Sequence, residues 1–564
     1  MKTEARFLLA VMLMLGVLVG TNRLFPPVVP DVVPDSLAGE EGDTTAAASG
    51  VADLPTLPGT AQQQPTTEET VDPIQAPPAE DFVTVEGPLY RYTFSTAGAR
   101  LISGELLAFD ALNRGGPVEL VPDGSEGFLG QKLVVGSDTV DLSRAPYSVE
   151  PAGGLRLNEN SGPQSLRFTY QPSDAFAFVV EYVFEPNQYT VAVSGRSMGV
   201  DRALLLTDLG AGLAFAEADS ALEVPSMAYV YNHQANGIRS EILEKAEPEV
   251  VNGPLLWGAF RSKFFVVALL AGDDEEASPE DLLGGLLVQP SPLVDRVRVA
   301  AAQTIAGGDY SYRLYLGPQQ YALLSSLGQD MQEVNPYGWR FFRPIVRPFV
   351  SLIMTVLNFL HDNLSLGYGW VLIVFGVAMR VVLFPLNHKA MRAQLRNMAV
   401  QPLVQEIQAK HKDNPEKLQK EMMKLYKEHG FNPLAGCLPM LLPWPVLIAL
   451  FFVFQNTIEL RGVPFLWLPD LSAKDPLYLL PIIMAASMFL IQWISLRSIE
   501  QTNPQMKMMM YIMPPMMLVI FLNLPSGLNL YYATANIATL PQQIWIAGER
   551  KKMRGQPPPK LSDD

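Results

Sequence analysis

Cysteine is almost absent from this chain of 564 residues: Cys437 is the only one, so no disulfide can form within the chain. Histidine is scarce too, with five residues, and none lies at a metal-ligand spacing from another histidine or from the cysteine. We therefore predict no metal site, and we expect the core of the soluble part to stabilise it without cross-links.

Charge is also in short supply. Charged residues make up 17% of the chain, whereas an average soluble domain has about 25%. The shortage is local, because the long apolar runs lie in residues 1–25 and 345–546. This pattern excludes a single soluble globule. The formal net charge of −16 argues against binding to DNA.

Several motifs of membrane enzymes and motors are missing. The sequence has no phosphate-binding Gly-x-x-x-x-Gly-Lys-Ser/Thr loop and no His-Glu-x-x-His. None of the predicted spans contains Asp or Glu, and Ser526 has no histidine in any span to activate it. We therefore expect neither an enzyme nor a proton-driven transporter, and no cofactor.

The N-terminal part predicts an anchor and a tether. Phe7–Gly20 is an unbroken apolar run after two basic residues, and no small-x-small cleavage site follows it. We interpret residues 1–23 as an uncleaved membrane anchor with a cytoplasmic N-terminus; the alternative is a cleaved signal peptide. Residues 24–81 contain ten Pro, eleven Asp or Glu and no Lys or Arg, which predicts a disordered tether outside the cytoplasm.

Residues 82–320 predict an all-β domain. Apolar residues alternate with polar ones in short runs that Gly, Pro, Asn and Asp separate, as in a sandwich or barrel. The clearest runs are Tyr90/Tyr92/Phe94, Leu166/Phe168/Tyr170, Phe176/Phe178/Val180/Tyr182/Phe184, Tyr189/Val191/Val193 and Tyr312/Leu314/Leu316.

Residues 335–363 predict an amphipathic helix along the membrane surface. The alternative is a buried helix of the β domain. The basic face holds Arg340, Arg343 and Arg347, and the apolar face holds Ile345, Phe349, Leu352, Ile353 and Val356.

Residues 366–547 predict a membrane core of five spans, which makes six with the anchor. The basic segments 387–430 and 548–564 are expected in the cytoplasm, and the segment 457–476 and the β domain outside. Residues 387–430 carry nine Lys or Arg and predict a cytoplasmic helical hairpin, with a helix that begins at Pro415. The spans are Tyr368–Leu386, Leu434–Phe454, Leu477–Ile494, Met508–Leu524 and Leu528–Ile546.

Arg380 is the sharpest functional signal. It interrupts an apolar span that has no acidic partner, and an arginine at the centre of a membrane costs roughly 2.5–3.5 kcal/mol. We expect it to face a water-filled cavity; the alternative is a side chain that reaches the cytoplasmic interface.

Two further sets of residues accompany this signal. Asn529, Tyr532 and Asn536 share one helix face, where lining a groove and ordinary packing are both open. Methionine is concentrated in the fifth span, which suits a surface for varied apolar partners or plain lipid contact. Its candidate slide residues are Met509, Met513, Met516 and Met517.

Long motifs in a fixed order resemble the YidC/Oxa family of membrane protein insertases, in its long Gram-negative form. They are Arg380-Val-Val-Leu-Phe-Pro-Leu, Asn432-Pro-Leu-Ala-Gly-Cys-Leu-Pro-Met, Phe465-Leu-Trp-Leu-Pro-Asp-Leu-Ser, Asp475-Pro-Leu-Tyr-Leu-Leu-Pro and Pro525-Ser-Gly-Leu-Asn-Leu-Tyr-Tyr.

The resemblance implies an insertase and chaperone of the bacterial inner membrane that works without nucleotide hydrolysis. Arg380 matches the arginine of a hydrophilic groove, Tyr531 and Tyr532 match an aromatic pair near the substrate path, and the β domain resembles a supersandwich in the periplasm. The implied partners are nascent membrane proteins, membrane lipid, the Sec translocon and, through hairpin and tail, the ribosome. The sequence departs from the family at Pro443, where the resemblance implies a polar, groove-lining residue. A scaffold role for the β domain and a carbohydrate-active β domain are the rival functions.

Overall fold

The structure is a computed structural model that describes residues 80–243, 246–272, 282–291, 297–335, 337, 343–385, 406–407, 410–411, 415–428, 444–497 and 504–552. The predicted anchor, nearly all of the tether and most of the hairpin lie outside these residues, as do Pro443 and the last twelve residues of the tail.

The β domain begins with a five-stranded sheet in the order β4-β3-β2-β1-β8, in which β8 pairs with β1 in parallel and the other pairs are antiparallel. Its strands are β1 (Phe82–Glu86), β2 (Tyr90–Ser95), β3 (Arg100–Asp110), β4 (Pro117–Glu119) and β8 (Leu155–Arg156).

A fourteen-stranded antiparallel sheet makes up the rest of the domain, in the order β6-β5-β12-β18-β17-β15-β16-β19-β11-β10-β9-β7, with β13 and β14 added beside β15. The strands are β5 (Gln131–Val135), β6 (Asp138–Asp141), β7 (Ser148–Glu150), β9 (Gln164–Ser173), β10 (Phe176–Phe184), β11 (Thr190–Met198), β12 (Arg202–Gly210), β13 (Ala228–His233), β14 (Gly237–Ile242), β15 (Glu249–Arg261), β16 (Phe265–Leu270), β17 (Leu283–Pro290), β18 (Val297–Ala306) and β19 (Asp309–Pro318).

The period-two pattern of the sequence explains how the two sheets pack. In β2, Tyr90, Tyr92 and Phe94 point to one face and are buried, and in β10 the alternate residues Tyr182 and Phe184 meet them. The rings of Tyr90 and Tyr92 stack with centroids 4.5 Å apart. Aromatic side chains of this size bury much apolar area. Their packing therefore stabilises the β domain, which has no disulfide.

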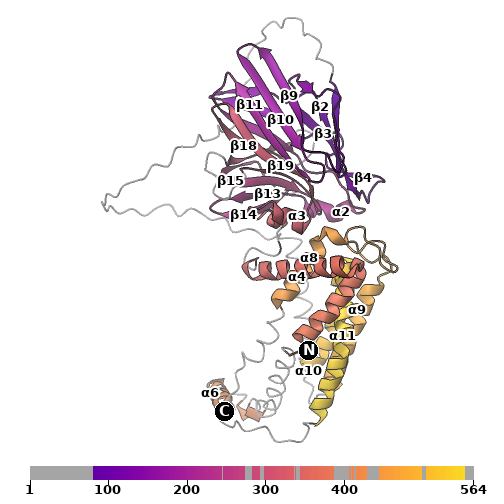
Figure 1. Ribbon diagram of the computed structural model, residues 1–564. Helices are drawn as coiled ribbons and strands as arrows, with labels where there is room; N and C mark the ends of the chain where they lie inside the picture. The colour runs from indigo at the N-terminus through magenta and orange to yellow at the C-terminus, as the bar shows by residue number, and fades with distance from the viewer. Residues whose placement is uncertain are drawn as a thin grey trace, which may run out of the picture.

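Two short helical turns lie between β12 and β13, and the other helices follow the last strand; Figure 1 shows the helices gathered on one side of the β domain. The elements are α2 (Ser220–Glu223), η1 (Val224–Ser226), α3 (Tyr321–Ser326), η3 (Met331–Val334), α4 (Arg343–Leu364), the helix Tyr368–Pro385, α6 (Pro415–Glu428), α8 (Trp444–Asn456), η4 (Ile458–Leu460), α9 (Leu479–Arg497), α10 (Pro504–Phe521) and α11 (Ser526–Lys552).

Among the described residues, three helices are long and apolar enough to cross a membrane: α4, Tyr368–Pro385 and α9. Shorter apolar stretches are Val446–Asn456 in α8 and Tyr511–Phe521 in α10. The count of six spans therefore stays a prediction. The helix α6 begins at Pro415, as the sequence predicts.

The helix α4 differs from its predicted faces. Its buried stripe is Val346, Val350, Ile353, Met354 and Leu357, which packs in the helical core rather than in the β domain. Of the residues predicted for the apolar face, Ile345 and Leu352 are exposed. The helix thus has two apolar faces. Figure 1 shows α4 lying across the molecule between the β domain and the steeply inclined α9 and α11.

Candidate functional site

The helix that carries Arg380 approaches α11 closely at Gly376. A Cβ atom at Gly376 would lie 3.3 Å from Cγ2 of Thr534 and 3.6 Å from a ring carbon of Tyr531. Arg380 follows Gly376 by one helical turn and so shares its face. Its half-buried guanidinium lies within electrostatic range of the hydroxyls of Tyr531 and Tyr532. The structure thus brings the predicted arginine and the predicted tyrosine pair together.

Aromatic rings fix the position of Tyr531. Its ring centroid lies 5.9 Å from that of Phe375, 5.4 Å from that of Phe454 and 5.4 Å from that of Tyr532. Three helices supply these rings, and Tyr531 is only 4% exposed. Tyr532 is less buried and meets Phe521 of α10 edge to face. Tyr531 is therefore a packed residue, while Tyr532 is the more accessible member of the pair.

Asn529 has a definite structural partner. It is fully buried, and its amide nitrogen donates to the carbonyl oxygens of Phe521 at 3.1 Å and Leu524 at 3.3 Å. Phe521 is the last residue of α10 and Leu524 lies in the turn before α11, so Asn529 caps the end of α10 and holds this turn. Its carbonyl Oδ1 has no partner among the described residues. Asn536, two turns further along α11, is half-buried.

The candidate methionines lie on α10 beside α9. Met513, Met516 and Met517 are half-buried, and Sδ of Met513 accepts a hydrogen bond of 3.7 Å from the amide of Gln492 on α9. The side chain of Met509 lies outside the described residues. Val519 and Ile520 follow on the same helix and are exposed. This part of α10 therefore presents apolar side chains outward.

Among the described residues, the site carries a positive charge without a matching negative one. Across the residues that the structure describes, Arg380 forms no ion pair with a carboxylate, and its electrostatic neighbours are the two tyrosines. A partly desolvated cation without a counter-charge favours the approach of an anion. The described ranges also hold no cluster of three metal-ligating side chains. The arrangement can attract a negatively charged segment.

Sequence reasoning missed the ring partners Phe375, Phe454 and Phe521, because isolated apolar residues in apolar spans carry no distinguishing signal. It also missed the role of Asn529 as a cap. The spacing of Asn529, Tyr532 and Asn536 indicates a shared face, but it does not tell which neighbouring helix each residue meets.

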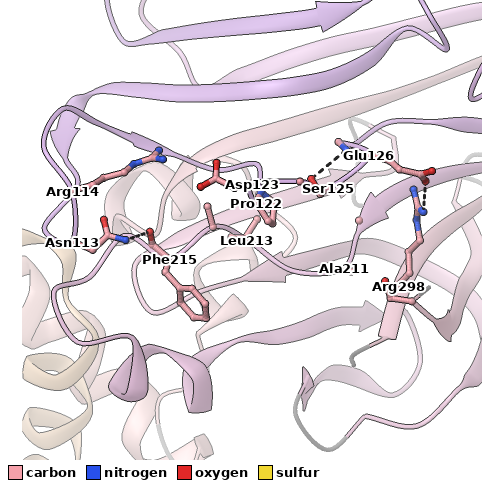
Figure 2. A pocket seen from close by; sticks show the side chains of 15 residues that line it. Asn113, Arg114, Pro122, Asp123, Ser125, Glu126, Ala211, Leu213, Phe215 and Arg298 are labelled. Carbon is pink, nitrogen blue, oxygen red and sulfur yellow. Dashed lines mark hydrogen bonds and ion pairs between the residues drawn. The ribbon is translucent and has the colours of Figure 1, made fainter. Parts of the chain in front are cut away.

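A separate pocket of about 680 Å³ lies in the β domain between the loops that follow β3, β4 and β12 (Figure 2). Its acidic residues are Asp123 and Glu126. Arg298 donates to Glu126 at 2.7 Å, and this hydrogen bond holds the pKa of that carboxyl below its usual range. A glycosidase acid needs a raised pKa instead. In this pocket Glu126 is therefore a charged acceptor that is paired with Arg298.

Two family models match the chain. The model described as YidC periplasmic domain matches residues 82–352, and the model described as 60Kd inner membrane protein matches residues 359–553. Together they cover the β domain and the helices that carry the site.

Curated relatives and solved structures match between 42% and 83% of the chain. The membrane protein insertase YidC of Chlorobaculum parvum is 32% identical over 501 residues, which are 83% of this chain and 82% of that protein. The same-named protein of Prosthecochloris aestuarii is 37% identical over 320 residues, 54% of this chain and 53% of that protein. The crystal structure of an active YidC insertase with its first transmembrane domain resolved is 18% identical, with a TM-score of 0.33, and the match covers 82% of this chain and 92% of that one. A putative mutarotase from Salmonella typhimurium is 11% identical with a TM-score of 0.28, over 42% of this chain and 91% of that one.

Proposed function

Because this chain belongs to the YidC family of membrane protein insertases, which act in the inner membrane and carry a periplasmic domain, we propose that its substrates pass along the face of α11 that Arg380 and Tyr532 border. The observation that supports this proposal is the half-buried Arg380, one turn after the close approach of Gly376 to Tyr531, with no carboxylate partner among the described residues.

Arg380 attracts the acidic residues of a translocated segment. Two unit charges about 4 Å apart interact by about 4 kcal/mol where the effective dielectric constant is near 20. This attraction offsets part of the cost of carrying a carboxylate into the bilayer. The hydroxyl of Tyr532 offers such a segment a polar contact at the same level of the helix.

The apolar part of the substrate uses a second surface. Met513, Met516 and Met517 present flexible thioethers that adapt to different side chains. Met509 is proposed for the same slide from its place in the sequence. Partition of the substrate helix into lipid supplies the driving force, at about 0.8 kcal/mol per buried CH₂ group. No nucleotide is hydrolysed and no covalent bond is made, so the protein acts as an insertase and chaperone rather than as an enzyme.

The membrane topology that fits this function has six spans with both termini in the cytoplasm. The nine basic residues of 387–430 and the basic tail support a cytoplasmic place for these segments. The position of α4 across the molecule supports a helix at the periplasmic membrane surface, since its exposed Ile345, Leu352 and Phe359 suit lipid contact. The proposed boundaries are those of the sequence: anchor 1–23, tether 24–81, β domain 82–320, surface helix 335–363, core 366–547 and tail 548–564.

The proposed partners are nascent membrane proteins and lipid, with the Sec translocon beside the core and the ribosome at the hairpin 387–430 and the tail. The helix α6 supports a cytoplasmic contact, because its charged residues Glu416, Lys417 and Lys420 are exposed beside a narrow apolar stripe.

Purified protein in sealed liposomes tests the function. The substrate is a small single-span protein with an acidic translocated tail, and the readout is protection of that tail from added protease. We expect Arg380→Ala to lower protection about tenfold, equivalent to about 1.4 kcal/mol, and Arg380→Lys to restore most of it. A substrate with a neutral tail should lose much less protection in Arg380→Ala.

Arg497→Ala is the matched control, because Arg497 stacks over Trp493 at the end of α9 and is on neither the Arg380 helix nor α11. Equal protection by Arg380→Ala and the unchanged protein would remove Arg380 from the path. Protection no higher than in empty liposomes would reject autonomous insertion.

A further inference from the structure

The segment 457–476 joins α8 to α9 and holds the motif that begins at Phe465 and the start of the one that begins at Asp475, yet the proposed path does not use it. We call it the clamp loop. Its own hydrogen bonds make it stiff: Oδ1 of Asp470 accepts from the backbone N–H groups of Gly462 at 3.0 Å and Ser472 at 2.7 Å. The carboxylate of Asp475 accepts from the indole of Trp467 at 3.2 Å and from the N–H of Leu480 at 2.7 Å, at the start of α9.

The clamp loop holds the first turn of α11. The N–H of Ser526 donates to the carbonyl of Ala473 at 2.7 Å, and the N–H of Gly527 donates to that of Leu471 at 2.8 Å. The hydroxyl of Ser526 adds a hydrogen bond of 2.6 Å to Ala473. The first N–H groups of a helix have no partner within it, so these bonds dock the helix of Tyr531 on the loop.

The same loop holds the start of the Arg380 helix. The ring of Phe465 lies edge-on to Trp370, with centroids 5.4 Å apart. It sits so close to Gly369 that a Cβ atom there would be 2.1 Å from the ring. At Gly527, a Cβ atom would lie 3.0 Å from Cδ1 of Leu460 and 3.3 Å from Cδ1 of Leu372. The loop and both helices of the site therefore meet at one point.

The β domain grips the clamp loop through a buried ion pair. Nε of Arg461 lies 2.7 Å from Oε1 of Glu217, and their side chains are only 4% and 11% exposed. The other guanidinium nitrogens donate to the carbonyls of Asp110 at 2.9 Å and Ala216 at 3.1 Å. Three residues before Arg461, Ile458 is buried in the core of the β domain.

Neighbouring charges extend this grip. Nζ of Lys263 lies 3.5 Å from the carbonyl oxygen of Ser472, and Lys474 pairs with Asp219 at 3.6 Å. Burial lowers the pKa of Lys263 and raises the pKa of Glu217, as expected for groups shielded from water. A buried pair is costly to break, because the remaining charge stays buried without its partner.

We propose that the clamp loop sets the spacing between the Arg380 helix and α11, and that the β domain holds the loop in place through Arg461 and Glu217. Arg461 is thus a positioning residue for the insertion path: it touches no substrate and acts through Phe465, Leu460 and the first turn of α11. The effect on insertion rests on the proposed function, whereas the effect on helix spacing does not.

Spin labels test the spacing directly in the full-length protein. Cysteines replace Val377 on the Arg380 helix and Ile537 on α11, both exposed, in a Cys437→Ser background, and the distance distribution between the labels is measured in lipid nanodiscs. We expect Arg461→Ala to shift or broaden this distribution. Without the label sites, we expect it to lower insertion of the acidic-tail substrate about fivefold, within the range of coupling between separated sites.

The exchanged pair Arg461→Glu with Glu217→Arg should partly restore the label distance and the insertion activity. Each single charge reversal should disturb both measurements more than Arg461→Ala does. Arg196→Ala is the matched control, because Arg196 pairs with Asp309 on the exposed face of β11 and β19. An unchanged distance distribution in Arg461→Ala would overturn the proposal. A changed distribution with unchanged insertion would keep the clamp and reject the proposed path instead.

Discussion

At the scale of single residues, burial decides which polar side chains remain free to meet a substrate. Asn529 and Arg380 are both polar residues in apolar helices, but the amide of Asn529 is used on the end of α10. Arg380 keeps a charge that has no carboxylate partner in the described part of the chain. Its sequence context predicts this exception, because no acidic residue occurs in its span. The role of Asn529 depends on where another helix ends, and local spacing does not contain that information.

Glu223 in the β domain is another buried polar residue whose surroundings change its chemistry. It is 1% exposed, and burial raises its pKa to about 7 from an ordinary value of 4.5, although the N–H groups of Ala216 and Glu217 donate to its carboxylate. A raised pKa means that the folded state holds the proton more tightly than the unfolded state. The stability contributed by this proton is complete below about pH 4.5 and is lost as the pH rises through about 7.

Glu223→Gln should therefore stabilise the β domain above neutral pH and change little in acid. We expect calorimetry of the full-length protein in detergent to show a higher unfolding temperature for the variant at about pH 8 and a similar one at about pH 5. Glu105→Gln, in a surface ion pair with Arg91, is the control. The same difference between variant and unchanged protein at both pH values would contradict the assignment.

At the scale of elements, the sequence predicts the strands well but does not predict the contacts of the clamp loop. The alternation in β2, β9, β10, β11 and β19 predicts strands correctly, since the period of two is a local property of a half-buried chain. The faces of α4 were predicted less well, because its buried stripe faces α8 while further apolar residues remain exposed. The ion pair of Arg461 joins residues 244 positions apart, and no local pattern reveals it.

Gly369 tests the contact between the clamp loop and the Arg380 helix. Gly369→Ala would drive the ring of Phe465 away, at a cost typical of overpacking, about 1–3 kcal/mol. We expect hydrogen–deuterium exchange of the backbone amides in 457–476 to become about tenfold faster. Gly367→Ala is a close control, since a Cβ atom there meets nothing within 4 Å. Equal exchange in the two variants would show that Phe465 does not hold the loop.

At the scale of the whole molecule, the β domain contacts the membrane core through the clamp loop, but we expect only the core to be essential for insertion. The family models match them separately, at residues 82–352 and 359–553. The helices of the site are held by their own aromatic cluster and by α9 as well as by the clamp loop. We therefore expect the core to keep insertion activity without the β domain. If the β domain carried the function as a scaffold, its removal would abolish that activity.

Deletion of residues 82–320 measures this difference. We expect insertion to fall about fivefold, to the level of Arg461→Ala, and the two changes combined to be no worse than the deletion alone, because both release the same loop. Protease protection in liposomes is the readout. Complete loss of insertion would favour the scaffold role, and no loss at all would show that the grip of the β domain is dispensable.

The clamp loop also holds the first turns of two helices that extend away from it, so a small tilt there moves their far ends further. Tyr368–Pro385 and α11 both start at the loop and run away from it in the same direction, and the first has 18 residues, which makes an arm about 27 Å long. A tilt of about 10° at the pivot displaces the far end by about 5 Å, close to the distance between neighbouring extended chains. Along the proposed insertion path, one small rotation at the clamp loop would thus change the opening between the far ends of these helices by about the width of one extended chain.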